Sequence, residues 1–225
     1  YLTNSRGGWL ALAVMVMVFA YLHLPYRKLG LVLGLGLVPL LFVLGPSRMQ
    51  TIDTKGGAVE GRLAAWGFGN HMLKQNPFFG VGRGRFTEFS GTGQVAHNSW
   101  VQCWAEIGMF GYFFWLGLIL AAMKDCWAFD RLEPRDPPDT ELQKLEKAAV
   151  AGLMGFLAAA FFLSRSYIQP LYVLLALFAA MRGIHEREVG DLEGGFHLSD
   201  WKYLAIAAVA SVPTMWLIIR FLNAM

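Results

Sequence analysis

Six stretches of mostly apolar residues alternate with polar connections along the chain of 225 residues. A helix needs about 20 apolar residues to cross about 30 Å of hydrocarbon, and these stretches reach or approach that length. We therefore predict an all-α integral membrane protein that forms one membrane domain over residues 1–225. The predicted transmembrane helices lie at residues 9–24, 29–44, 98–123, 148–163, 167–181 and 203–222.

Two long polar connections, residues 45–97 and 124–147, interrupt this pattern. The short connection between the first two predicted helices carries Arg27 and Lys28, and Lys and Arg in short loops favour the cytoplasmic side. This orientation makes residues 124–147 a cytoplasmic loop and residues 45–97 an external loop.

The composition agrees with a membrane protein, because 56% of the residues are apolar, only 16% are charged and the mean hydropathy is +0.43. These values exclude a soluble Rossmann, barrel or nucleic-acid-binding domain, and a net charge of +3 is too small to indicate nucleic acid. Cys103 and Cys126 fall in or at the end of one apolar helix, which excludes a disulfide framework. The chain starts at Tyr1 without a signal-peptide pattern, so we expect the C-terminal part of a longer protein.

The external loop carries the whole net charge of the protein. It has six basic and three acidic residues, whereas the remaining residues include 13 of each sign. A basic loop above a membrane suits an anionic ligand such as a phosphate or a lipid headgroup. A solvated loop with incidental charge is the alternative.

Residues 59–75 of this loop have apolar side chains at helical spacing, which predicts an amphipathic helix on the membrane surface. Arg62 and Trp66 are four residues apart and share one side of that helix. We expect the guanidinium to lie beside the aromatic ring at the level of the lipid headgroups, although an arginine that merely extends its charge toward water would show the same pattern.

A glycine-rich segment follows, in which Gly80, Gly82 and Gly84 alternate with other residues and Arg83 and Arg85 flank the last glycine. The glycines allow positive φ and close approach to a ligand, so the segment could form an anion-binding nest. Its spacing matches neither a phosphate-binding P-loop nor a dinucleotide motif. A glycine-rich turn is the simpler interpretation.

His97 lies where the external loop meets the third predicted span, at the membrane–water boundary. Its imidazole titrates near neutral pH when unperturbed. Gly108 and Gly111 should let another helix approach closely. Glu106 is an intramembrane carboxylate in a polar stripe with Ser99 and Gln102, which makes it a functional candidate or a helix-packing hydrogen bond.

Together these motifs resemble the O-antigen ligase and polymerase superfamily of bacterial membrane glycosyltransferases. Trp66 departs from the Arg-x3-Leu pattern of strict ligases, and members of the superfamily are usually about twice as long as this chain. The resemblance rests on Ser5-Arg6-Gly7, Arg62-x3-Trp66, Asn76-Pro77-x2-Gly80-x-Gly82 and His97-Asn98-x9-Gly108-x2-Gly111.

The resemblance implies glycan transfer from undecaprenyl pyrophosphate to an acceptor hydroxyl at the periplasmic face of the inner membrane. It also implies a reaction without a nucleotide sugar or other cofactor, and attack from the face opposite the carrier would invert the anomeric carbon. Since the acidic residues and histidine of the external loop lack metal-ligand spacing, we expect no catalytic metal. His97 would be the base, Arg62 would act with it, and Arg6, Arg62, Arg83 and Arg85 would bind pyrophosphate. The supporting residues would be Trp66, Asn98, Glu106, Gly108 and Gly111.

The residues leave several alternatives open. The enzyme could be a ligase, a polymerase or a protein O-glycosylation ligase, with a glycan, lipid A core or protein hydroxyl as acceptor. A transporter or flippase half with a lipid-binding loop, an inactive fragment and a metal-dependent oligosaccharyltransferase are the other possibilities. Arg165 is a further phosphate candidate, for which an exposed turn charge is the simpler interpretation.

Overall fold

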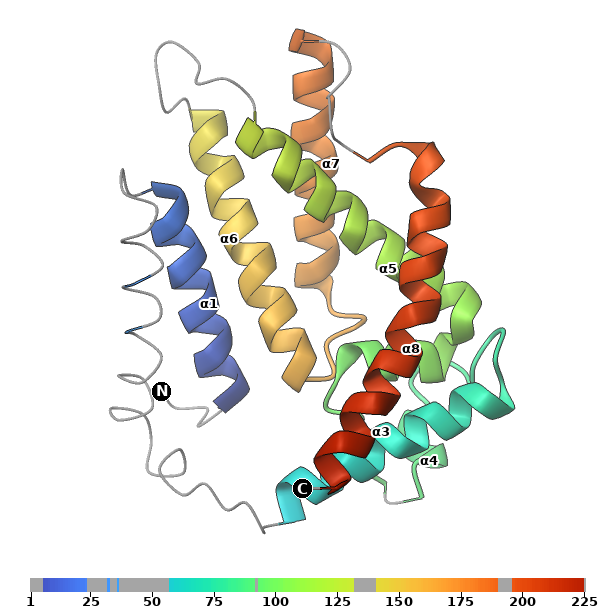
Figure 1. The fold of residues 1–225 in the computed structure, drawn as a ribbon. Coiled ribbons are helices and arrows are strands. Elements are labelled where there is room, and N and C mark those ends of the chain that lie inside the picture. Colours follow the sequence, from blue (N-terminus) through green and yellow to red (C-terminus); the bar gives the residue numbers. More distant parts are fainter. Residues whose placement is uncertain are drawn as a thin grey trace. The chain divides into compact units, whose positions relative to one another are not determined.

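The structure is a computed structural model that describes residues 6–23, 57–91, 93–131, 141–189 and 196–224, with the single positions 32 and 36 (Figure 1). All regular secondary structure in these residues is helical, as predicted. The helices are α1 (Arg6–His23), α3 (Gly57–Gln75), α4 (Phe86–Phe89), α5 (Ser99–Arg131), α6 (Glu141–Phe162), α7 (Gln169–Val189), the 3-10 helix η2 (Leu198–Asp200) and α8 (Trp201–Ala224).

Three of the described helices are long and apolar enough to cross a membrane: α5 over Ser99–Phe129, α6, and α8 over Trp201–Ile218. The apolar part of α1, Gly7–His23, is shorter. α7 is helical where a span is predicted, but its C-terminal part carries charged residues. The predicted span at residues 29–44 lies outside the described residues, apart from positions 32 and 36, so the total of six spans stays a prediction.

α5 and α6 continue beyond their apolar stretches into the polar connection predicted at residues 124–147. α5 ends at Arg131 and α6 begins at Glu141. An acidic residue in the first turn favours a helix start, and Lys144 forms a 2.9 Å ion pair with Glu141. Hydropathy marks the end of the apolar part of a helix, whereas charged turns can extend the helix into water.

The chain divides into two compact units, which are described separately. Unit 1 comprises Tyr1–Ile52, Ala122–Ala159 and Tyr167–Gly195, and unit 2 comprises Asp53–Ala121, Ala160–Ser166 and Phe196–Met225. The core of unit 1 joins the end of α5 to α6 and α7. Its buried side chains are Ala122, Cys126, Ala128, Phe129, Ala149, Leu153, Phe178 and Met181.

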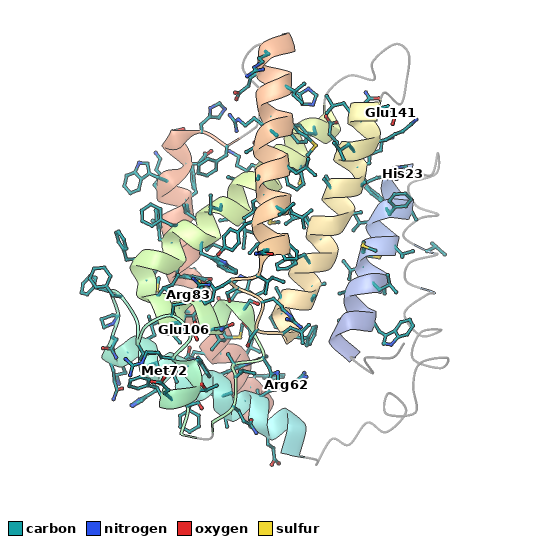
Figure 2. The ribbon with its side chains drawn as sticks, turned by 180° about the vertical axis from the view of Figure 1, so that it is seen from behind. His23, Arg62, Met72, Arg83, Glu106 and Glu141 are labelled. Atoms are coloured by element: carbon teal, nitrogen blue, oxygen red, sulfur yellow. The ribbon has the colours of Figure 1, made fainter. Side chains whose placement is uncertain are left out.

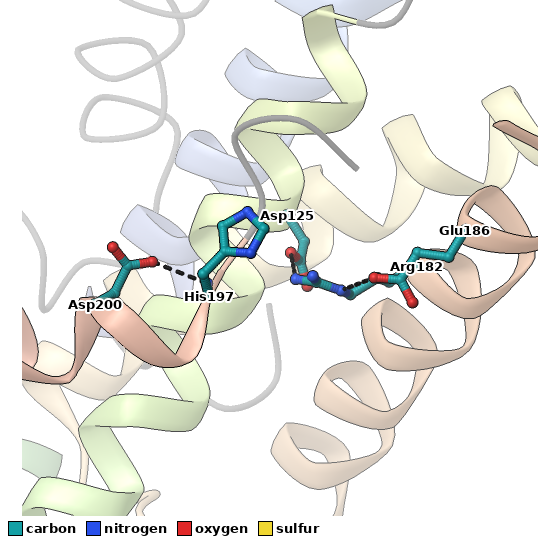
Figure 3. A network of polar contacts seen from close by, with 5 residues as sticks. All are labelled: Asp125, Arg182, Glu186, His197 and Asp200. Atoms are coloured by element: carbon teal, nitrogen blue, oxygen red, sulfur yellow. Dashed lines mark hydrogen bonds and ion pairs between the residues drawn. The ribbon is translucent and has the colours of Figure 1, made fainter. Parts of the chain in front are cut away.

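A polar network also links the helices of unit 1 (Figure 3). Arg182 donates to Asp125 at 2.8 Å and to Glu186 at 2.7 Å. A buried pair between His185 and Glu146 connects α7 to α6. The buried members of this network, Asp125, Glu146 and His185, thus each have a polar partner, as buried polar groups in folded proteins generally do.

In unit 2, α3 buries the apolar stripe that the sequence predicts. Leu63, Trp66 and Leu73 are all buried. Gly69 lets α3 pack closely against α5, since a Cβ at this position would lie 2.3 Å from Cγ1 of Val101. Protein therefore covers the apolar face of α3. The position of this helix at the membrane surface stays a prediction.

Candidate functional site

The helix α5 is interrupted at Gly108, which has φ 65° and ψ −174°. The segment that carries Asn76-Pro77-Phe78-Phe79-Gly80-Val81-Gly82 fills this interruption. Backbone groups freed by the break bond to that segment instead of to their own helix. The four hydrogen bonds are Val81 N–H to Ala105 C=O (2.9 Å), Gly82 N–H to Glu106 C=O (2.9 Å), Met109 N–H to Pro77 C=O (2.8 Å) and Phe110 N–H to Phe78 C=O (3.1 Å).

Two glycines make this close contact possible. A Cβ on Gly108 would lie 2.3 Å from the carbonyl oxygen of Phe78, and a Cβ on Gly80 would lie 2.5 Å from the carbonyl carbon of Glu106. Gly108 thus admits a loop and not the helix we expected. At Gly111 the nearest atoms to a Cβ would belong to Ile107 on the same helix, and close approach of another helix there stays a prediction.

The glycine-rich segment has the positive φ angles that we predicted, 67° at Gly80, 104° at Gly82 and 80° at Gly84. Its first N–H groups, however, do not form an anion nest. The N–H of Gly80 donates to Asn76, and the next two donate to α5. The start of the segment therefore serves contact with α5, and Gly80 in particular permits the close approach.

Asn98 begins the intact first part of α5. Its side-chain oxygen accepts the N–H of Val101 at 3.0 Å, which is a standard N-cap, and its side-chain nitrogen donates to the carbonyl of Phe161 at 3.1 Å. The asparagine of the His-Asn motif therefore fixes both the start of the helix and its contact with the end of α6.

His97 has φ 50°, the left-handed conformation, and it is the one non-glycine residue with positive φ among the residues described. Such a conformation costs about 1–3 kcal/mol and persists only where its surroundings hold it. Here the His97 N–H donates to Oγ of Ser164 at 3.0 Å, and Asn98 is held as a cap. The imidazole is thus carried on a fixed, strained backbone, as functional side chains often are.

The turn between α6 and α7 is bonded to the start of α5. Ser99 Oγ donates to the carbonyl of Leu163 at 2.7 Å and accepts the N–H of Arg165 at 2.8 Å. Ser166 Oγ donates to the carbonyl of Ser99 at 2.7 Å. The backbone of Arg165, a further phosphate candidate with an exposed side chain, is therefore bonded to Ser99, two residues after His97. No local sequence signal links these positions.

Trp66 connects α3 to the same place. Its indole N–H donates to the carbonyl of Ala96 at 2.8 Å, and its ring packs edge-on against Phe161 at 5.9 Å between centroids. Trp66 is only 6% exposed, so protein surrounds its ring. It holds the residue before His97.

Arg62 lies one turn before Trp66 and is half-buried (Figure 2). Within the described part of the chain it forms no ion pair with a carboxylate. Partial burial, and secondly the positive charge of Arg62, lower the pKa of His97 from its usual 6.5. A lower pKa leaves the imidazole neutral at neutral pH, which is the form that a general base needs.

Arg83 and Arg85 are both exposed on the turn after the glycine-rich segment. Arg85 forms a 2.8 Å ion pair with Glu88, and its guanidinium lies 4.9 Å from the centre of the Phe89 ring. Both partners of that pair are more than half exposed, so the pair is weak and an anion can compete for Arg85.

A family model described as O-antigen ligase matches residues 1–116, which is more than half of the 225 residues. The chain belongs to the O-antigen ligase family. No curated protein and no solved structure matches it. Membership confirms the family that the motifs resemble and indicates a membrane glycosyltransferase of surface polysaccharide synthesis, with lipid-linked glycan and acceptor as its general partners.

The part of the chain that matches the O-antigen ligase family contains Arg62, Trp66, His97 and Asn98, which the structure brings together in unit 2. Arg165 joins them from outside the matched residues. Arg6 begins α1, but its side chain lies outside the described part of the structure, so its predicted role is untested.

Proposed function

We propose that the protein transfers a glycan from undecaprenyl pyrophosphate to an acceptor hydroxyl at the periplasmic face of the bacterial inner membrane. The observation that carries this proposal is that α3, which carries Arg62, is bonded to the residue before His97 through the indole N–H of Trp66. Partial burial, and secondly the positive charge of Arg62, lower the pKa of the imidazole there. An anion-binding cation next to a neutral base is the pairing that glycosyl transfer from a pyrophosphate needs.

In the proposed reaction, the acceptor oxygen forms a bond to the anomeric carbon while the bond from that carbon to the pyrophosphate oxygen breaks. The electron pair of the broken bond remains on the pyrophosphate, and His97 takes the acceptor proton. Attack from the face opposite the leaving group inverts the anomeric centre. The guanidinium of Arg62 stabilises the charge that develops on the leaving oxygen, because it remains protonated throughout.

The charge on Arg62 also links donor binding to the basicity of His97. In the free protein, Arg62 disfavours the protonated imidazole. A bound pyrophosphate neutralises Arg62, so the pKa of His97 rises when the donor is present and His97 becomes the stronger base. Arg6, Arg83, Arg85 and Arg165 are proposed as further pyrophosphate contacts, and no metal takes part.

The proposal is tested in a strain that lacks the gene, complemented with full-length wild type or with His97→Asn. Asparagine tolerates the left-handed backbone at this position but cannot act as the base. Without activity, carrier-linked polymer should accumulate if the enzyme is a ligase, and single carrier-linked repeat units if it is a polymerase.

The His97→Asn protein should insert normally and should lower turnover by about 10²- to 10⁴-fold, the usual range for a lost general base. In detergent, the wild-type activity should survive EDTA. Normal glycan transfer by His97→Asn would remove His97 from the mechanism, and loss of activity with EDTA that Mg²⁺ restores would favour a metal-dependent transferase.

A further inference from the structure

We propose that Glu106 is a positioning residue that presents the turn carrying Arg83 and Arg85 to the pyrophosphate of the donor. This inference rests on the proposed function. It gives a role in substrate binding to a carboxylate that is buried in α5 and distant in sequence from both arginines (Figure 2).

Both ends of the arginine turn are bonded to this one residue. The N–H of Gly82 donates to the backbone carbonyl of Glu106 at 2.9 Å, and the N–H of Phe86 donates to its side-chain Oε1 at 3.3 Å. Between these ends, the N–H of Arg85 donates to the carbonyl of Gly82 at 3.2 Å. The turn is therefore closed on itself and fixed to α5 at two points.

The two points depend on different parts of Glu106. The Gly82 bond uses the backbone, so it forms with any side chain at this position and belongs to the contact that Gly80 and Gly108 permit. The Phe86 bond needs an acceptor on the side chain. Removing that acceptor should free the second end of the arginine turn and leave the first end in place.

The carboxylate also continues toward His97. Its Oε1 accepts from the side chain of Gln102 at 3.4 Å, and the side-chain oxygen of Gln102 lies 3.5 Å from Oγ of Ser166. Ser166 is bonded to Ser99 at the start of α5. The arginine turn and the start of α5 are thus linked through a partly buried series of polar side chains.

Burial explains why this residue is an effective anchor. Glu106 is 1% exposed, and Phe86, whose N–H it accepts, is 2% exposed. Water cannot replace a hydrogen bond at such a site, so loss of the acceptor leaves the N–H of Phe86 without a partner and the turn must move to satisfy it. An exposed carboxylate would have no comparable effect.

Two substitutions separate the acceptor from the bulk of the side chain. Glu106→Met keeps most of the volume and has no oxygen acceptor, whereas Glu106→Gln keeps an oxygen at the position of Oε1. Cys103→Ala, one turn earlier on α5 and also buried, is the control for a general disturbance of the helix core.

The first readout is amide hydrogen exchange of the full-length protein in detergent, which requires no activity. In Glu106→Met, peptides covering residues 82–89 should exchange about 3- to 10-fold faster, as expected for one lost hydrogen bond, while the rest of α5 is unchanged. Glu106→Gln and Cys103→Ala should match wild type in this segment. Unchanged exchange in Glu106→Met would overturn the inference.

The second readout is kinetic. Glu106→Met should raise KM for the lipid-linked donor with little change in kcat, and in an Arg83→Ala Arg85→Ala background it should add no further increase. Additive effects, or a collapse of kcat in Glu106→Gln, would refute the positioning role. Failure of the proposed function would instead appear as normal transfer by His97→Asn, with the exchange result unaffected.

Discussion

At the residue scale, His97 combines a strained backbone with a lowered side-chain pKa. Three separate contacts surround it: Ser164 on its own N–H, Trp66 on the carbonyl before it, and the cap formed by Asn98 after it. These contacts fix the backbone of His97 and of its two neighbours, which is the support that the proposed role as a base requires.

Replacing Arg62 by lysine should cause a strong loss of glycan transfer, even though the charge is retained. A lysine offers a point charge and does not reproduce the planar fork that binds two phosphate oxygens at once. We expect kcat/KM for the lipid-linked donor to fall by at least about tenfold, equivalent to about 1.4 kcal/mol of transition-state stabilisation.

The matched control for Arg62→Lys is Lys74→Gln, which changes an exposed residue on the same helix. It should retain wild-type activity and thermal stability. If Arg62→Lys lowered stability and activity in parallel, a structural role would account for Arg62 and the pyrophosphate contact would have to be abandoned.

The lowered pKa of His97 predicts the pH dependence of the reaction. A general base acts in its neutral form, so kcat/KM should rise with pH through the pKa of His97 in the free enzyme, with a midpoint below 6.5. Because the positive charge of Arg62 is one cause of the lowering, Arg62→Gln should move that pKa upward. NMR titration of labelled histidine measures both values, and a downward or absent shift would contradict the assignment.

At the element scale, the interruption of α5 at Gly108 forms a junction in which the backbone of this helix bonds to the glycine-rich segment. Four backbone hydrogen bonds replace those lost at the break, so the cost of interrupting the helix is largely offset. The exposed arginines follow immediately after the junction. The element that crosses the membrane thereby also fixes the turn that carries the charge.

Gly108→Ala should strongly destabilise this junction, because the new Cβ would meet backbone atoms at 2.3–2.5 Å and the residue would keep a positive φ. Gly84→Ala is the matched control, since it has φ 80° and no atom within 4 Å of its Cβ position. We expect about 1–2 kcal/mol for the control, the cost of the left-handed backbone alone, and clearly more for Gly108→Ala. Equal shifts in melting temperature would show that the junction is not tightly packed in solution.

At the scale of the whole molecule, the proposed reaction requires that α3 and its arginine face the periplasm. Single cysteines at Lys74 and Glu141, two exposed positions, test this orientation in a protein whose own Cys103 and Cys126 are buried. An impermeant thiol reagent should label Lys74→Cys in intact spheroplasts, and Glu141→Cys only after the membrane is opened.

The reverse labelling pattern would place the candidate site in the cytoplasm, where the proposed donor glycan is not presented. Labelling of both positions in intact spheroplasts would mean that they share one side of the membrane. Either result would require another function for the site.

The amino-acid sequence alone determined the features that depend on near neighbours in the chain. Hydropathy identified the helical membrane class, the spacing of Leu63, Trp66 and Leu73 identified the buried face of α3, and the glycine pattern identified the positive φ angles of the loop. The motif around His97 identified the family. Each of these signals lies within a few turns of chain, where periodicity and backbone sterics act.

The tertiary structure decided which distant segments meet. His97 is bonded to Ser164, 67 residues later in the chain, and Phe86 is bonded to Glu106, 20 residues later. Gly108 packs against Phe78 at the break in α5. The tertiary structure also decided that protein covers the apolar face of α3. A hydrogen-bonding group or an apolar stripe specifies the kind of partner it needs but not where in the chain that partner lies, because many segments could supply it and only the packed fold selects one.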